Sequence, residues 1–280
     1  MAISFQELMG HPDGDPGVYD EYARQGRRVF SVLTGTPVII AAHNEELTLP
    51  LTLAALTQQS VEVCPIVIDN ASDDRTAEVA EKFGAVVLEE SSKGKVRALQ
   101  TGIRFTRELS GDDSTLLFTD GDARPVSRWA EHLIHKSRAD DVPEIATGLA
   151  VYNNALGMKQ LGLNALRFGY ANGKNLLRMR HSIPPIIRGH NMALLSPGDQ
   201  ILDPILVLPN YFPGEDIAIR DIVLKAGGRA AIRLHPHAAV FTSGDRFPDI
   251  ASALRRYKLG VASQAEFYPG STQEYISDLD

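Results

Sequence analysis

Two aspartates separated by one glycine, Asp120 and Asp122, are the residues of this 280-residue chain whose types and spacing most clearly suggest chemistry. They follow the apolar run 116–118, which predicts a buried strand. We therefore expect the pair at the carboxyl end of a strand, the edge at which open α/β sheets bind ligands. Two carboxylates that converge there repel each other unless a cation lies between them, and hard oxygen ligands suit Mg²⁺ or Mn²⁺. An ordinary Asp-Gly turn is the alternative interpretation.

A second acidic pair, Glu215 and Asp216, stands at the start of a helix predicted over 216–226. Acidic residues are common in a first helical turn because they complement the helix dipole. A carboxylate can also act as a general base that takes a proton from an attacking hydroxyl. Taken alone, the pair is better explained as ordinary acidic residues at a helix N-terminus.

The elements that must position these residues alternate regularly after residue 37. The alternation predicts a mostly parallel sheet with right-handed crossovers, in the α/β class. The predicted strands are 37–41, 63–69, 85–88 and 114–119, and the predicted helices are 47–59, 75–83, 96–109 and 128–138.

Beyond residue 145 the pattern is less regular. We predict strands at 145–151, 186–195, 230–234 and 238–241 and helices at 161–179 and 216–226. Two further helices are predicted near 18–33 and 249–267. The predicted organisation is an N-terminal helical extension (1–35), a main domain (36–248, with halves divided near residue 125) and a C-terminal helical tail (249–280).

Composition limits the class of protein. Apolar residues make up 44% of the chain and charged residues 22%, as in ordinary globular proteins. The formal charge of -7 argues against a nucleic-acid partner. The single cysteine, Cys64, excludes an intramolecular disulfide. The start of the chain lacks signal-peptide features, and no stretch reaches the roughly 18–20 apolar residues of a membrane span. We expect a cytoplasmic protein, with peripheral membrane contact and homo-oligomers left open.

Several motifs, taken in order, resemble those of the family 2 glycosyltransferases, which have the GT-A fold. Any one of these motifs could arise by chance, but the occurrence of all of them in the same order as in the family is a strong signal. Residues 38–46 resemble the opening strand and P-A-Y-N-E-E turn, 67–76 resemble V-D-D-G-S-x-D-x-T, and 94–103 resemble G-K-G-x-A-L-x-x-G-I. Residues 119–123 contain the D-x-D, 188–193 resemble G-x-N-x-A, and 214–217 contain the E-D motif.

The resemblance implies a Rossmann-like central sheet with a smaller acceptor-side region, and transfer of a sugar from a nucleotide-diphospho-sugar to an acceptor hydroxyl. It implies direct metal ligation by Asp122, with Asp120 also at the Mn²⁺ or Mg²⁺ site, nearer the ribose. The residues implied for donor binding are Ala41, His43, Asn44, Glu45, Asp69, Asn70, Lys95, Asp120, Gly121 and Asp122. Those implied for the substrate are Gly189, His190, Asn191, Glu215 and Arg246.

In this context Asp216 is our candidate for the general base, which predicts in-line displacement with inversion. We expect UDP-sugars ahead of GDP-sugars as donors. The acceptor class is a lipid, a glycan or a small solute. His237 is a second candidate metal ligand, although the family position after residue 241 is Thr242 here.

Three alternative functions remain. A retaining GT-A enzyme that makes a small glycosylated solute shares the strand-turn motifs. A sugar-1-phosphate nucleotidyltransferase uses a similar sheet and metal, and residues 50–52 echo its signature, but the Gly-rich, Arg-containing loop is absent from 41–45. A sugar-nucleotide-binding protein without activity is the third, against which the intact acidic residues argue.

Overall fold

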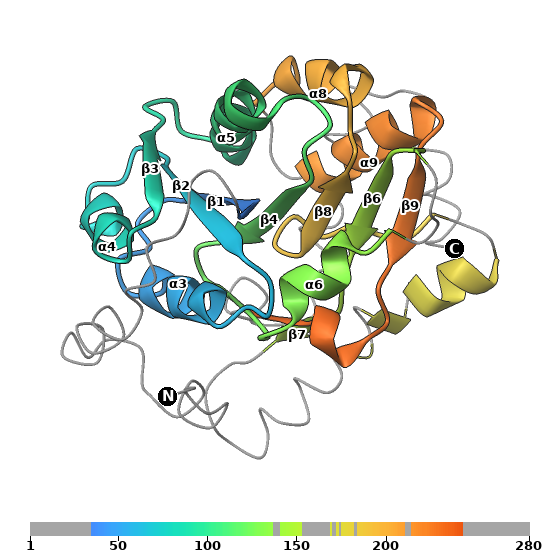
Figure 1. Cartoon of the computed structure of the whole chain (residues 1–280), viewed down its shortest axis with the longest axis horizontal. Coiled ribbons are helices and arrows are strands. Elements are labelled where there is room, and N and C mark those ends of the chain that lie inside the picture. Colours follow the sequence, from blue (N-terminus) through green and yellow to red (C-terminus); the bar gives the residue numbers. More distant parts are fainter. Residues whose placement is uncertain are drawn as a thin grey trace, which may run out of the picture.

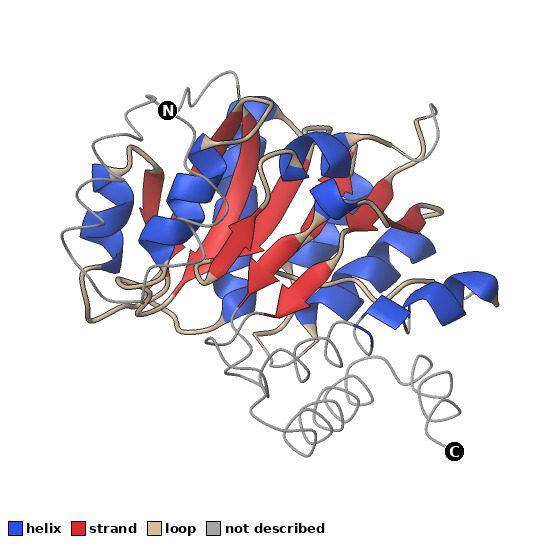
Figure 2. Cartoon of the chain, turned by 90° about the horizontal axis from the view of Figure 1, so that it is seen from below, coloured by secondary structure: helices blue, strands red, loops and turns tan. Residues whose placement is uncertain are grey.

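The computed structural model describes residues 35–136, 141–152, 169, 172–173, 175–181, 184–210 and 214–242. The helices predicted at 18–33 and 249–267, the tail 249–280 and most of the helix predicted at 161–179 lie outside the described residues. Within them, a central sheet is covered by helices on both faces (Figures 1 and 2).

The central sheet has seven strands in the order β3-β2-β1-β4-β8-β6-β9. All neighbours are parallel except at β8, which runs antiparallel to both β4 and β6. This agrees with the predicted mostly parallel sheet. The strands are β1 (Thr36–Ala42), β2 (Val63–Asp69), β3 (Val86–Glu89), β4 (Leu116–Asp120), β6 (Glu144–Thr147), β8 (Met192–Leu195) and β9 (Arg229–Ile232).

Helices cover the sheet in two layers because successive side chains of each strand point to opposite faces. Val38 and Ile40 of β1 pack toward the first layer, and Ile39 packs toward the second. The first layer contains α3 (Leu49–Thr57), α4 (Thr76–Lys82) and α6 (Trp129–Ile134), and the second contains α5 (Lys95–Ser110), α8 (Asp199–Leu206) and α9 (Glu215–Lys225).

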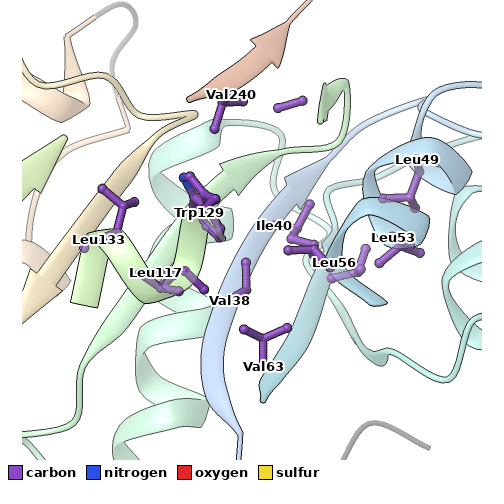
Figure 3. Close-up of a cluster of buried hydrophobic side chains, with 14 of the residues drawn as sticks. Val38, Ile40, Leu49, Leu53, Leu56, Val63, Leu117, Trp129, Leu133 and Val240 are labelled. Atoms are coloured by element: carbon purple, nitrogen blue, oxygen red, sulfur yellow. The ribbon is translucent and has the colours of Figure 1, made fainter. Parts of the chain in front are cut away.

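The core beneath α3 and α6 contains Trp129, the largest of the fully buried side chains. Figure 3 shows Leu49, Leu53 and Leu56 of α3 and Trp129 of α6 gathered around the central strands, all of them buried. Burying a side chain of this size contributes on the order of 1.5–3 kcal/mol. This packing fixes α3 against the strands whose ends carry the acidic residues.

A second, three-stranded sheet has the order β5-β10-β7. Strand β5 (Ala123–Pro125) begins one residue after Asp122 and pairs with β10 (Val240–Thr242), which also pairs with β7 (Ala150–Tyr152). A short 3₁₀ helix, η1 (Pro236–Ala238), precedes β10. The aspartates 120 and 122 therefore lie between a strand of the large sheet and a strand of the small one.

Some element predictions were wrong in the second half of the chain. The strand predicted at 145–151 is two strands, β6 and β7, that belong to different sheets. Of the strand predicted at 186–195 only β8 forms, because residues 188–191 make a turn. Helix α8, with Pro204 inside it, and strand β5 were not predicted. A short apolar run does not reveal which partner strands it will meet.

No helix among the described residues is long and apolar enough to cross a membrane. The cytoplasmic location remains a prediction from the sequence.

Candidate active site

The carboxyl ends of three adjacent parallel strands bring two of the predicted acidic residues to one edge. In the register of the sheet, Ala41 of β1 lies opposite Asp120 of β4, and Ala42 lies opposite Asp69 of β2. Asp120 is buried and Asp69 is partly buried. Their side chains thus flank the end of β1, where the predicted turn 43–46 begins.

That turn is held by side chains from the loop after β2. The turn exposes His43 and Asn44, and Asn44 has φ of 57°, a left-handed conformation in which Asn is enriched. Three successive backbone N–H groups donate to this loop: Asn44 to Ser72 Oγ (3.0 Å), Glu45 to Thr76 Oγ1 (2.8 Å) and Glu46 to Asp74 Oδ2 (3.0 Å). The presence of both motifs thus has a physical reason, since side chains of one satisfy the backbone N–H groups of the other.

Asn70 organises the loop that leads into α5. Its Nδ2 donates to the carbonyl of Ser92 at 2.8 Å, and its Oδ1 accepts from the N–H of Gly94 at 2.7 Å. These bonds place Lys95, the first residue of α5. Asn70, predicted to take part in donor binding, thus contacts the loop that positions Lys95. Its contact with the donor stays a prediction.

Lys95 connects the two predicted acidic centres. Its Nζ lies 2.7 Å from Asp120 Oδ1 and 3.2 Å from Glu215 Oε1. Burial opposes the charged form of Lys95, but the charges of Asp120 and Glu215 outweigh it and raise the pKa of the ammonium above its usual value. Lys95 is therefore a fixed positive charge between the end of β4 and the start of α9.

Gly189 permits this close arrangement. A Cβ at position 189 would lie 3.0 Å from Lys95 Nζ and 3.3 Å from Glu215 Oε1. Any side chain there would push against the ion pair. The backbone N–H of Gly189 donates to the Asp216 carboxylate. The main chain of Gly189, predicted to lie on the substrate side, is therefore close to Lys95, Glu215 and Asp216.

Asp216 is the residue of this network whose pKa is shifted into the neutral range. Desolvation by burial and the neighbouring charge of Glu215 raise its pKa to about 7, although Lys95 and the backbone N–H groups of Ile217 and Gly189 act in the opposite direction. The buried Glu215 keeps its own partners, Lys95 and the Gly214 N–H. A carboxyl with a pKa near neutrality suits a general base.

The side chain of Asn191 is hydrogen-bonded within the protein. It is fully buried, and its Oδ1 accepts from the indole N–H of Trp129 at 2.9 Å. Its Nδ2 donates to the carbonyls of Leu149 (2.9 Å) and Ala238 (3.1 Å). These bonds tie α6 to the backbone that leads into β7 and β10. The substrate contact predicted for Asn191 stays a prediction.

We expect Asn191→Leu to destabilise the protein by about 3–5 kcal/mol, because it leaves the Trp129 N–H and two buried carbonyls unpaired. Urea denaturation measures the change. Asn210→Ala is the matched control, since Asn210 is exposed and makes one side-chain bond, to the Lys93 carbonyl. If Asn191→Leu unfolds no more readily than the control and loses only substrate binding, the original substrate role is right.

The remaining predicted residues have clear positions. The turn 188–191 places His190 beside β4, where its carbonyl accepts from Thr119 Oγ1 at 3.0 Å. His237 packs against His132 and His235, with ring centroids 5.5 and 5.0 Å away. This cluster is at the opposite end of β10 from Thr242, which lies beside Ala123, so His237 is not at the predicted metal site. Arg246 lies outside the described residues.

The donor set at the end of β4 fits a hard divalent cation. Asp120 and Asp122 offer carboxylate oxygens, and Mg²⁺ is commonly held by one or two carboxylates together with substrate phosphates and water. Among the described residues, no group of three or more His, Cys, Asp or Glu side chains could hold a metal ion. A cation here would take its remaining oxygen ligands from other sources, such as water or a bound phosphate.

The sequence did not predict the residues whose side chains hydrogen-bond the loops at the site. Ser72, Asp74 and Thr76 lie within the motif 67–76 but had no predicted role of their own, and no role was predicted for Asn210. The signal that could have found them is their type, since short polar side chains commonly bind backbone groups in turns.

With this geometry in place, the comparison with known proteins is decisive for the family. Residues 38–194, more than half of the chain, match glycosyl transferase family 2. The chain belongs to this family. The matched residues include the ends of β1, β2 and β4, Lys95 and the turn 188–191, and stop before Glu215.

Two curated relatives share the first part of the chain. A 4,4'-diaponeurosporenoate glycosyltransferase of Staphylococcus haemolyticus is 38% identical over 123 residues, which are 41% of this chain and 30% of the relative. Glycosyltransferase AglE of Haloferax volcanii is 33% identical over 110 residues, which are 36% of this chain and 34% of the relative. The matched segments therefore span about a third of the length of each relative.

Solved structures share the fold. A mannosyltransferase from Pyrobaculum calidifontis in complex with GDP-Man and Mn²⁺ has a TM-score of 0.60 at 19% identity, covering 89% of this chain and 72% of that one. Glucosyl-3-phosphoglycerate synthase from Mycobacterium tuberculosis, in complex with Mn²⁺, UDP and glucosyl-3-phosphoglycerate, has a TM-score of 0.53 at 19% identity, covering 91% and 85%. The fold is thus that of the GT-A glycosyltransferases, as predicted.

Proposed function

We propose that this protein is a metal-dependent glycosyltransferase that moves a sugar from a nucleotide-diphospho-sugar to an acceptor hydroxyl with inversion at the anomeric carbon. The single observation that carries the proposal is the Lys95 bridge. One ammonium group contacts Asp120 at the donor edge and Glu215, the neighbour of Asp216. The residues proposed for donor binding and for catalysis are therefore held in one connected charged network.

The donor half of the site is formed by the ends of β1, β2 and β4. Asp69 and the turn 43–46 provide hydrogen-bonding groups for the base and ribose, with Glu45 held in place by Thr76. Asp122, with Asp120, would hold Mn²⁺ or Mg²⁺. When bound there, the cation supplies positive charge against the diphosphate that departs in the reaction.

The acceptor half provides the base. Asp216 takes the proton from the acceptor hydroxyl as its oxygen attacks the anomeric carbon, the glycosidic bond to the diphosphate breaks, and the diphosphate leaves with the bonding electrons. With a pKa near 7, Asp216 is ionised in a large part of the molecules at neutral pH and still basic enough to accept a proton. Glu215, fixed by Lys95, is placed to bind acceptor hydroxyls.

The comparisons support the reaction class, but the similar solved structures bind different nucleotides. The two solved relatives in fold were bound to GDP-Man with Mn²⁺ and to UDP with Mn²⁺, which supports a nucleotide-sugar donor and a divalent cation. We favour a UDP-sugar as donor, and a lipid, a glycan or a small solute as acceptor. The family match favours this function over the nucleotidyltransferase alternative.

Calorimetric titration of the protein with UDP, GDP and their common sugar conjugates, each with Mn²⁺ and with EDTA, tests the donor site. We expect binding of the UDP series that depends on Mn²⁺. Metal-dependent binding of the GDP series alone would correct the base, and no metal-dependent binding in either series would refute the proposed donor site. With a turned-over acceptor, the anomeric configuration of the product, read by NMR, distinguishes inversion from retention.

A further inference from the structure

The turn that carries the acidic pair rests on helix α3. Thr52, in the first part of α3, has no exposed surface, and its Oγ1 donates to the carbonyl of Gly121 at 2.7 Å. Gly121 is the residue between Asp120 and Asp122. The hydroxyl of Thr52 therefore holds the Gly121–Asp122 peptide group, one of the two that join the proposed metal-binding residues.

A second contact holds the same turn from another direction. A Cβ at Gly121 would lie 3.0 Å from Glu45 Cγ and 3.2 Å from Glu45 Cβ, so the turn is packed directly against the Glu45 side chain. The Glu45 carboxylate is in turn hydrogen-bonded by the hydroxyl of Thr48. Contacts from Thr52 and Glu45 thus leave the Asp120–Asp122 turn little room to rotate.

Helix α3 is itself held firmly by its buried side chains. Leu49 and Leu53 are fully buried against the central sheet, and Thr52 lies between them in sequence on a helix with eight buried residues (Figure 3). A hydrogen bond from a fixed helix to a buried carbonyl transmits this rigidity to the turn. The direction in which the Asp122 carboxylate points follows from the orientation of the Gly121–Asp122 peptide.

We propose that Thr52 is a positioning residue that fixes the Asp120-Gly121-Asp122 turn in its metal-binding conformation. This inference rests on the proposed function, because it assumes that the turn binds a divalent cation. Residues that orient metal ligands typically contribute about 10–100-fold to metal affinity. Thr52 contacts no substrate in this role and acts only through the backbone of the turn.

The test is the dissociation constant of Mn²⁺, measured by electron paramagnetic resonance of the free ion with UDP or GDP present. Thr52→Val keeps the shape of the side chain but leaves the Gly121 carbonyl without its donor, and we expect roughly tenfold weaker Mn²⁺ binding. Thr52→Ser keeps the hydroxyl and should bind Mn²⁺ within about twofold of the wild-type protein, even if the lost methyl group lowers its melting temperature.

Thr106→Val is the matched control. Thr106 is also a buried threonine whose hydroxyl donates to a backbone carbonyl, that of Gly102, but both residues lie within α5. We expect this variant to lose stability without losing Mn²⁺ affinity. Equal Mn²⁺ affinities of Thr52→Val and Thr106→Val would overturn the proposal and leave Thr52 a purely structural residue.

Two further outcomes are distinguishable. If Thr52→Val does not fold, Thr52→Ala replaces it, and the proposal then requires weaker Mn²⁺ binding by Thr52→Ala than by Thr52→Ser; equal binding overturns it. If the wild-type protein itself binds no Mn²⁺ with either nucleotide, the proposed function fails, and the inference about Thr52 fails with it.

Discussion

Asp216→Asn is expected to lower the rate of sugar transfer about 10³-fold while leaving the dissociation constant of the nucleotide-sugar unchanged. The amide keeps the shape of the side chain and can still accept from the N–H groups of Ile217 and Gly189. It cannot take a proton from the acceptor hydroxyl. Turnover at saturating donor and acceptor, together with calorimetric donor binding, measures the two effects separately.

The same substitution is expected to stabilise the protein in alkaline solution. Because the pKa of Asp216 is raised from 3.8 to about 7, the folded state holds a proton that the unfolded state releases. The free energy of unfolding of the wild-type protein therefore falls, through this group, as the pH rises from about 4 to 7. We expect Asn to remove this loss, by on the order of 1–3 kcal/mol at pH 8, and to have little effect at pH 4.

Asp199→Asn is the matched control, because Asp199 occupies the first turn of α8 as Asp216 occupies that of α9. An acid that serves only the helix dipole should stabilise the fold slightly, so Asp199→Asn is expected to cost stability and leave transfer unchanged. If Asp216→Asn behaves like Asp199→Asn, the general-base assignment is wrong. For the wild-type protein, transfer should rise with pH, reach half of its plateau near pH 7 and level off above about pH 8.

Asp122→Ala is expected to abolish the part of donor binding that depends on Mn²⁺. Removing the carboxylate takes away the proposed direct ligand of the cation and, with it, the charge that the diphosphate requires. We expect the donor dissociation constant in Mn²⁺ to rise about 100-fold, to the value measured for the wild-type protein in EDTA. Calorimetry in the two buffers gives both values.

Asp73→Ala controls for the general loss of negative charge near the donor edge. Asp73 is exposed in the loop after β2. Its backbone N–H, which donates to Asn44 Oδ1, remains in the variant. The control should retain metal-dependent binding. Donor binding by Asp122→Ala that still responds to Mn²⁺ as in the wild-type protein would exclude Asp122 as a ligand.

Much of the donor half was predictable because its information is local. A parallel strand buried on both faces is a continuous apolar run, and the residue that ends the run lies at the sheet edge. The runs before Ala42, Asp69 and Asp120 are of this kind, and all three residues lie at the ends of adjacent strands. The family motifs indicated the same positions, and the family match, over residues 38–194, covers all three of them.

The second half of the chain was less predictable because its elements depend on distant partners. Residues 144–152 supply one strand to each of two sheets, and the backbone changes sheet at Gly148–Leu149. Periodicity reports which residues are buried but not which strand they will meet. The structural bonds of Asn191 were not predicted for a related reason, since a polar residue in a motif does not reveal its buried partners.

The sequence by itself therefore determined the family, the fold class, the order of the first strands and the acidic residues at their ends, because each depends on a local pattern. Only the tertiary structure decided how these residues act together. Lys95 meets Asp120 and Glu215 from positions 25 and 120 residues away in the chain. Such contacts, like the Thr52 bond to Gly121, arise when strands and helices pack, and no local pattern encodes them.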